Sequence, residues 1–116
     1  MSRTDCVFCR IVAGDAPADI VYRWPDAVAF VPLGPVTEGH VLVVPKVHVQ
    51  DATEDPYTTG LAMSAAAELG RTMWPCNIIT SAGELATQTV FHLHLHIVPR
   101  REGDGLALPW TTGERR

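Results

Sequence analysis

The segment in which histidine alternates with leucine constrains the fold of this chain more than any other feature. It reads His92-Leu93-His94-Leu95-His96. Side chains of a β-strand point alternately to opposite faces of a sheet, with a period of two. The alternation therefore predicts a strand over residues 90–98, whose leucines pack into a core and whose three imidazoles line an open face or cleft.

The other apolar runs predict the partners that such a strand needs. Further strands are expected at residues 20–22, 27–31, 40–44 and 78–80, between turns that contain proline or glycine. Short connections between the first three of these favour antiparallel pairing. A short helix is expected over residues 7–13. A main helix is expected to start after the signals at residues 53–55, with Pro56 in its first turn, and to include residues 59–73. The expected fold class is α+β, with about five antiparallel strands, one main helix and a short N-terminal helix.

Length and composition fit a single domain over residues 1–116, with a flexible polar tail from about residue 101. Apolar residues make up 47% of the chain, which is enough for a core without disulfide bonds. The net charge of -4 argues against a nucleic-acid partner, which requires a basic surface. No apolar run approaches the ~20 residues that span a bilayer, and no secretion signal is evident. We therefore expect no membrane partner, a cytoplasmic location and reduced cysteines.

Three neighbouring imidazoles can supply a proton donor, a proton acceptor and a nucleophile near neutral pH. A histidine nitrogen can attack phosphorus and form a covalent intermediate, while neighbouring donors stabilise charge on the phosphoryl oxygens. Two alternatives are a solvated polar face and a catalytic zinc ion bound by His92, His94 and His96. On an extended strand the outer two histidines lie about 13 Å apart, too far for one metal unless the strand bends.

Together with three other segments, the histidine run resembles the histidine triad (HIT) superfamily. The family motif His-φ-His-φ-His-φ-φ, where φ is an apolar residue, is matched by residues 92–98. Residues 39–48 are similar to the signature Gly-His-φ-φ-φ-φ-Pro-Lys-x-His, and residues 6–11 resemble the family's opening helix. Residues 88–91, Gln-Thr-Val-Phe, resemble the Gln-Ser-Val-Tyr of the nucleoside-phosphoramidase branch.

The resemblance implies a nucleotidyl hydrolase or transferase that acts on the α-phosphate of nucleoside 5′-phosphate derivatives. Its substrate would be a purine nucleotide derivative, either a phosphoramidate or a dinucleoside polyphosphate, and the protein would be a homodimer. The middle histidine, His94, would be the nucleophile and would form a nucleotidyl-histidine intermediate, with His96 and Gln88 as further catalytic residues. The residues that match phosphate-binding positions are Ser81, Gln88, Thr89 and His96, and those that match the nucleoside pocket are Phe8, Ile11, Phe30 and Leu42.

Two positions depart from the family pattern. The family usually has an acidic residue that binds the ribose hydroxyls where this chain has Pro32, and often has asparagine where this chain has Ser81. Losing one polar contact weakens binding by about 1 kcal/mol. These departures leave open an alternative function, a nucleotide-binding regulatory protein with little catalysis.

A structural zinc site is also implied by the resemblance. On its own, the pair Cys6 and Cys9 leaves open a redox motif or two unliganded thiols. The resemblance adds His48 and His92, which complete the ligand set of the zinc-type members of the family. Two thiolates and two imidazoles form a closed tetrahedral site, so we expect structural zinc and no catalytic cofactor. His40 is expected to make structural hydrogen bonds.

Overall fold

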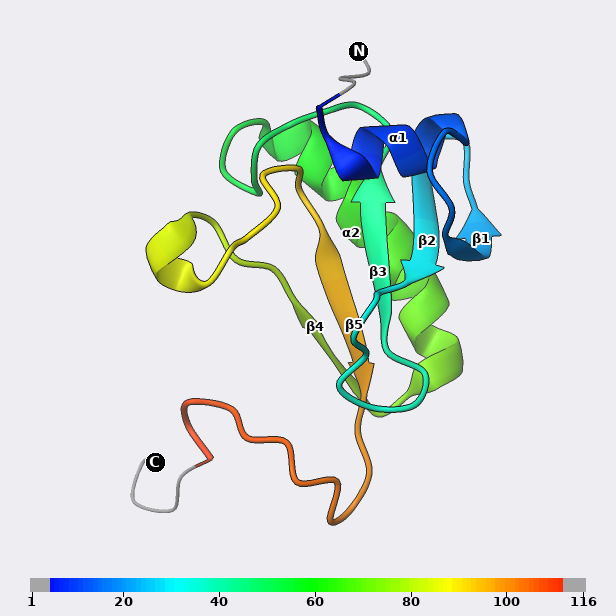
Figure 1. The fold of residues 1–116 in the computed structure, drawn as a ribbon. Coiled ribbons are helices and arrows are strands. Elements are labelled where there is room, and N and C mark those ends of the chain that lie inside the picture. Colours follow the sequence, from blue (N-terminus) through cyan, green and yellow to red (C-terminus); the bar gives the residue numbers. More distant parts are fainter. Residues whose placement is uncertain (1–4, 112–116) are drawn as a thin grey trace.

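A five-stranded antiparallel sheet forms the centre of the molecule, with the strand order β1-β2-β3-β5-β4 (Figure 1). The computed structural model describes residues 5–111. The strands are β1 Asp19–Arg23, β2 Ala27–Val31, β3 Val41–Pro45, β4 Cys76–Ile79 and β5 Leu95–Pro99. The helices are α1 Val7–Ala13 and α2 Pro56–Gly70, with short 3-10 helices η1 Arg71–Met73 and η2 Glu84–Ala86. The expected α+β class is thereby confirmed.

The strand that carries the last histidine lies inside the sheet and not at its edge. β5 pairs with β3 on one side, where Leu42 is opposite His96, and with β4 on the other, where Ile79 is opposite the same histidine. β1, β2 and β3 form the expected antiparallel succession. Two hydrogen-bonded neighbours hold β5, so a side chain on it has a well-defined direction.

The predicted start of the last strand was wrong. Regular pairing begins at Leu95 and not at residue 90. The backbone N–H of Leu93 donates instead to the carbonyl of Val49, at 2.8 Å, in the loop that follows β3. The predicted alternation is nevertheless present, because Leu93, Leu95 and Ile97 all belong to one core cluster.

Each face of the sheet has its own core. α2 covers one face, behind the sheet in Figure 1, and its Ala62 and Ala66 are fully buried. Alanine side chains allow the helix backbone to approach the sheet closely. α2 begins at Pro56, the proline expected in its first turn, and ends at Gly70, after which Arg71–Met73 form η1.

The opposite face of the sheet is covered by α1, and this is the face toward which the imidazoles point. Phe8, Cys9 and Ile11 of α1 are buried in a second cluster with residues of β2 and β3. A helix of 7 residues is too short to be stable alone, so these contacts fix its position.

The chain after β5 runs away from the lower end of the sheet (Figure 1). Arg101 donates to the hydroxyl of Thr37 at 2.7 Å and to the carbonyl of Glu38 at 3.1 Å. Residues 112–116 of the expected flexible tail lie outside the described residues, so that expectation stays a prediction. Neither helix between residues 5 and 111 combines the length and the apolar character that a bilayer crossing needs.

Substitution of Leu95 by alanine tests the packing that orients the imidazoles. Leu95 is fully buried against the α2 side of the sheet, so we expect Leu95→Ala to lower the free energy of unfolding by about 2–5 kcal/mol. Urea denaturation followed by circular dichroism measures this change. The matched control is Leu85→Ala, at a fully exposed leucine, which should change the free energy of unfolding by less than about 0.5 kcal/mol. Equal losses in the two variants would contradict the assignment of the core.

Candidate functional site

Four sulfur and nitrogen ligands converge where α1 meets the sheet. Cys6, Cys9, His48 and His92 each offer one atom, and these atoms all lie within 4.8 Å of one another. Nδ1 of His92 is 3.4 Å from Sγ of Cys6 and 3.5 Å from Sγ of Cys9. Nδ1 of His48 is 3.2 Å from Nδ1 of His92 and 3.3 Å from Sγ of Cys9. The four residues predicted as metal ligands are therefore brought together.

The hydrogen bonding of His92 leaves the correct nitrogen available to a metal. Its Nε2 lies 2.8 Å from the carbonyl oxygen of Pro45, the last residue of β3. A carbonyl only accepts, so Nε2 carries the proton and Nδ1 presents its lone pair to the two thiols. His92 is fully buried, and this burial lowers its pKa to about 4, which favours the neutral form that binds metals.

The spacing of the four atoms fits zinc. Tetrahedral zinc with ordinary bond lengths separates two nitrogen ligands by about 3.3 Å and a nitrogen from a sulfur by about 3.6 Å. In the structure the two nitrogens are 3.2 Å apart, three of the four nitrogen–sulfur pairs are 3.3–3.5 Å apart, and all pairs lie within 4.8 Å. Two thiolates and two imidazoles are also the donor set that a closed zinc site uses.

His94 uses its other ring nitrogen for a hydrogen bond within its own segment. Nδ1 of His94 lies 2.8 Å from the carbonyl of His92, so Nδ1 carries the proton and donates. Burial lowers the pKa of His94, which favours the neutral ring, and the lone pair is then on Nε2. The ring of Phe8 stands edge-on to His94, with the ring centroids 5.2 Å apart.

A chain of hydrogen bonds fixes the proton on His96. The backbone N–H of Val36 donates to Nδ1 of His40 at 3.0 Å, so the proton of the neutral His40 ring is on Nε2. That nitrogen lies 3.0 Å from Nδ1 of His96 and donates to it, which leaves Nε2 of His96 as an N–H donor. Burial, followed by the charges of His94 and His40, lowers the pKa of His96 to about 4, and burial also lowers the pKa of His40. The structural hydrogen bonds expected for His40 are present.

The three imidazoles therefore have three different settings. His92 faces the cysteines, whereas His94 and His96 line a cavity, and within residues 5–111 only His92 of the three belongs to the metal-ligand group. This arrangement does not support the alternative in which all three bind one catalytic metal.

The cavity has a volume of about 550 Å³ and is lined mainly by apolar residues. The four residues expected to form a nucleoside pocket all line it: Phe8, Ile11, Phe30 and Leu42. Thr89, His94 and His96 supply polar groups, Asp19 adds a carboxylate, and Pro32 is also at the wall. A volume of this size lies within the usual range for small-molecule sites, about 300–1,000 Å³.

Two of the predicted phosphate-binding residues lie outside this cavity. Gln88 is 3% exposed, and its Oε1 accepts from the N–H of Gly83 at 2.8 Å. Its Nε2 donates to the carbonyls of Gln50 and Val90, at 2.8 and 3.1 Å. The Gln88 side chain thus braces the loop that carries Thr89. Ser81 lines a second, smaller cavity that also borders His96.

Two further features of the site were missed by the reasoning from sequence. Thr87 also lines the second cavity, and it has a positive φ of 78°, which is uncommon for a residue other than glycine. Arg100 holds the segment after β5 through an ion pair with Asp104. Their opposite charges, four residues apart, were a visible signal of an ion pair. Nothing in the sequence indicated that this segment closes a cavity.

The fold and the site together define a class of protein, an α+β domain with a histidine strand above an apolar cavity and a zinc-type ligand cluster. Residues 13–103 match the family profile described as HIT domain. The chain therefore belongs to the HIT family.

Several named relatives are similar over most of the chain. Protein hit of Bacillus subtilis is 38% identical, and the match covers 93% of this chain and 80% of the relative. Adenylylsulfatase HINT3 of Arabidopsis thaliana is 32% identical over 90% of this chain and 56% of the relative. Adenosine 5′-monophosphoramidase HNT1 of Saccharomyces cerevisiae is 28% identical over 94% of this chain and 72% of the relative.

Solved structures show the same fold. A zinc-bound histidine triad family protein from Mycobacterium smegmatis is 42% identical, with a TM-score of 0.78 over 88% of this chain and 79% of that chain. SMU.412c from Streptococcus mutans is 38% identical, with a TM-score of 0.87 over 97% of this chain and 76% of that chain.

Metal analysis of the purified protein tests the Cys6, Cys9, His48 and His92 cluster. We expect roughly one zinc ion per chain, as a single tetrahedral site requires, and near-complete loss of zinc in Cys9→Ser. The matched control is Cys76→Ser, because Cys76 is not among the clustered ligands. Inductively coupled plasma mass spectrometry gives the ratio. Equal zinc content in the two variants, or none in the unaltered protein, would contradict this assignment.

Proposed function

We propose that the protein is a nucleotidyl hydrolase or transferase that acts on the α-phosphate of nucleoside 5′-phosphate derivatives. The observation that carries the proposal is the setting of His94. Its Nδ1–H is engaged by the carbonyl of His92, and within residues 5–111 no hydrogen bond engages Nε2. A neutral imidazole with an available lone pair, at the wall of a cavity of about 550 Å³, is suited to attack phosphorus.

His96 complements this nucleophile. Its Nε2–H is a hydrogen-bond donor because Nδ1 already accepts from His40. The rings of His94 and His96 have their centroids 5.3 Å apart, so one phosphoryl group can contact both. We assign His96 and the Thr89 hydroxyl to the phosphoryl oxygens, where donors stabilise the charge that develops during the reaction.

The reaction proceeds in two displacement steps. Nε2 of His94 forms a bond to phosphorus while the bond from phosphorus to the leaving group breaks. For a phosphoramidate, the electron pair of that bond goes to the leaving nitrogen, which takes a proton from solvent. The resulting imidazolium still donates from Nδ1 to the His92 carbonyl. Water then attacks phosphorus, the bond to Nε2 breaks with return of its electron pair, and the water releases a proton. The net products are a nucleoside monophosphate and an amine.

The apolar walls of the cavity are assigned to the nucleoside. Phe8 and Phe30 lie edge-to-face with centroids 5.5 Å apart, and Ile11 and Leu42 line the same cavity. Flat aromatic bases bury well between such side chains. A purine nucleotide derivative is the substrate we propose, and a homodimer stays a prediction from the resemblance.

Zinc has a structural role in this proposal. The four ligands come from α1 and its N-cap, the loop after β3 and the segment before β5. When bound, zinc would tie these three parts together and so hold the backbone carbonyl that orients His94. Four protein ligands fill a tetrahedral shell, so no position is assigned to substrate.

The family and its named relatives support a nucleotide hydrolase role at the level of reaction class. One of the relatives is named as an adenosine 5′-monophosphoramidase and another as an adenylylsulfatase. The second candidate is a nucleotide-binding regulator with little catalysis. It is suggested by the same cavity, because Pro32 offers no acceptor to the ribose.

Replacement of the proposed nucleophile separates the enzyme from the regulator. We expect His94→Asn to lower the turnover of adenosine 5′-phosphoramidate by about three orders of magnitude or more while AMP still binds. Peptide mass spectrometry of the unaltered protein after brief mixing with substrate should find a nucleotidyl adduct on His94, and none in the variant. AMP binding is measured by calorimetry. Turnover that survives in His94→Asn would reject covalent catalysis, and no turnover in either protein would favour the regulator.

Pro32 offers a gain-of-function test of the cavity. An aspartate at this position would provide an acceptor for the ribose hydroxyls, and hydrogen bonds to charged groups contribute about 1.5–3 kcal/mol. We expect Pro32→Asp to raise the preference for ribose over 2′,3′-dideoxyribose substrates by about ten- to a hundredfold in kcat/KM. Pro32→Ala is the control and should leave that preference unchanged. An identical preference in both variants would mean that the sugar does not lie beside Pro32.

A further inference from the structure

The residue that carries the proposed nucleophile lies just outside the regular part of the sheet. His94 directly precedes β5, which begins at Leu95. The last register pair between β4 and β5 joins Ile79 to His96, and the last pair between β3 and β5 joins Val43 to Leu95. Regular pairing with the neighbouring strands therefore ends before it reaches His94. Because the direction of a side chain follows from that of its backbone, other contacts must hold this residue.

Two hydrogen bonds hold the backbone on either side of His94. Before it, the N–H of Leu93 donates to the carbonyl of Val49 at 2.8 Å. That N–H belongs to the same peptide unit as the His92 carbonyl, which accepts from Nδ1 of His94. After it, the hydroxyl of Thr80 donates to the carbonyl of His94 at 2.7 Å. The Cα atom of the proposed nucleophile thus lies between two held peptide units, and Thr80 is the one residue that contributes a side chain to holding them.

Thr80 reaches this carbonyl from the side of the sheet that faces away from the imidazoles. Ile79 and Ser81 line the smaller cavity, whereas Ile78 packs against the core beneath α2. Side chains alternate between the two faces along an extended chain, so Thr80 belongs with Ile78. The half-buried Thr80 lines neither of the two cavities. It can therefore act on a bound substrate only through the backbone of His94.

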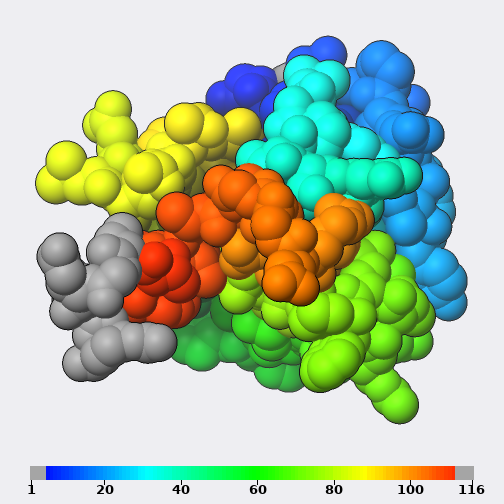
Figure 2. Space-filling model, turned by 90° about the horizontal axis from the view of Figure 1, so that it is seen from below, coloured from blue at the N-terminus to red at the C-terminus, as the bar shows by residue number. Residues whose placement is uncertain are grey.

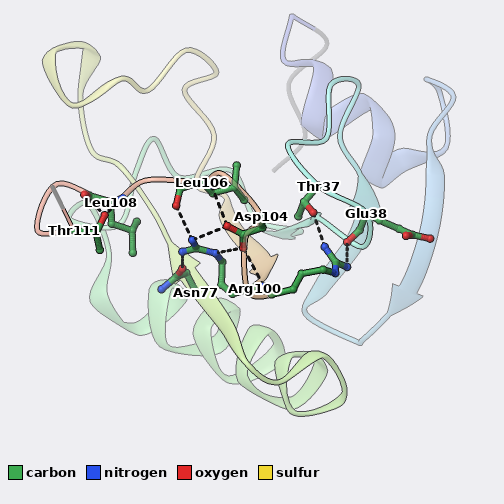
Figure 3. A network of polar contacts seen from close by, with 9 residues as sticks. Thr37, Glu38, Asn77, Arg100, Asp104, Leu106, Leu108 and Thr111 are labelled. Carbon is green, nitrogen blue, oxygen red and sulfur yellow. Dashed lines mark hydrogen bonds and ion pairs between the residues drawn. The ribbon is translucent and has the colours of Figure 1, made fainter. Parts of the chain in front are cut away.

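Because β4 is an edge strand, contacts at its other end help to define where Thr80 lies. Arg100 donates from Nη1 to Oδ1 of Asn77 at 2.6 Å, and its backbone N–H donates to the carbonyl of Pro75 at 2.8 Å. The same guanidinium donates to both carboxylate oxygens of Asp104, at 2.8 and 3.1 Å (Figure 3). Figure 2 shows this orange segment packed between the loop that precedes β3 and the loop that carries η2. The start of β4 is thus held by Arg100, and the residue after its end bonds to the histidine segment.

We propose that Thr80 is a positioning residue for the proposed nucleophile. Its hydroxyl fixes the peptide unit that follows His94, and through it the direction in which the imidazole presents Nε2 to the cavity. This inference rests on the proposed function, because it concerns the same attack on phosphorus. A misplacement of about 1 Å in a reacting group lowers a rate by about a hundredfold. A hydrogen bond to the backbone of the nucleophile therefore acts on turnover and not on substrate binding.

Removal of the Thr80 hydroxyl tests this assignment. Thr80→Val keeps the branched shape and the strand preference of threonine but loses the donor. We expect kcat for adenosine 5′-phosphoramidate to fall by about tenfold while KM changes by less than about twofold, because the cavity that binds the nucleotide is intact. The rate at which His94 acquires the nucleotidyl adduct in a single turnover, followed by rapid-quench mass spectrometry, should fall by about the same factor.

Two further variants locate the effect in this hydroxyl. Thr80→Ser retains the donor and should keep kcat within about twofold of the unaltered protein. Thr72→Val is the matched control, because the exposed Thr72 also donates from its hydroxyl to a backbone carbonyl, that of Leu69, at 2.7 Å. This control should leave kcat unchanged. If circular dichroism shows that Thr80→Val does not fold, Thr80→Ala is compared with Thr80→Ser, from which it differs by one oxygen atom, and the same tenfold ratio in kcat is expected.

The outcomes distinguish this inference from the proposed function. Equal kcat values in Thr80→Val and the unaltered protein would overturn the inference alone. The same holds if the loss lies in KM, if Thr80→Ser is as slow as Thr80→Val, or if Thr72→Val is slowed by the same factor. Absence of turnover in the unaltered protein would remove the proposed function and this inference with it.

Discussion

The burial of Leu93, Leu95 and Ile97 beneath α2 is the interaction on which the rest of the structure depends. Because side chains alternate along an extended chain, packing these three aliphatic groups on one side directs the intervening imidazoles to the other. Each fully buried leucine or isoleucine stabilises the fold by about 1.5–3 kcal/mol relative to an exposed one. Apolar packing on the α2 side of the sheet thereby orients the imidazoles on the opposite side.

Backbone groups then distinguish imidazoles that are identical in sequence. The carbonyl oxygen of Pro45 accepts a hydrogen bond from His92, and the carbonyl oxygen of His92 accepts one from His94. The backbone N–H of Val36 donates to His40, which in turn donates to His96. Each contact fixes the nitrogen that carries the proton, since a carbonyl accepts only and an N–H donates only. Three residues of one type thus acquire three different properties from their neighbours: His92 is a candidate metal ligand, His94 has an available lone pair and His96 is an N–H donor.

The sequence predicted the α+β class, the antiparallel order of the first strands and the four clustered metal ligands, because each depends on local periodicity or on a matched motif. It did not predict that β5 begins at Leu95, since the N–H of Leu93 bonds to the distant Val49. It also did not predict that the amide of Gln88, which matches a phosphate-binding position, is bonded to three backbone groups of loops. Such contacts depend on tertiary placement, which residue spacing does not encode.

The short helix α1 serves two sites at once. Cys9 and the N-cap residue Cys6 belong to the metal-ligand cluster, while Phe8 and Ile11 form walls of the apolar cavity. A helix of 7 residues has little stability of its own, so whatever orders it serves both sites. Since such coupling is reciprocal, a ligand that orders α1 at one of these sites would raise the affinity of the other site for its own ligand by the same factor.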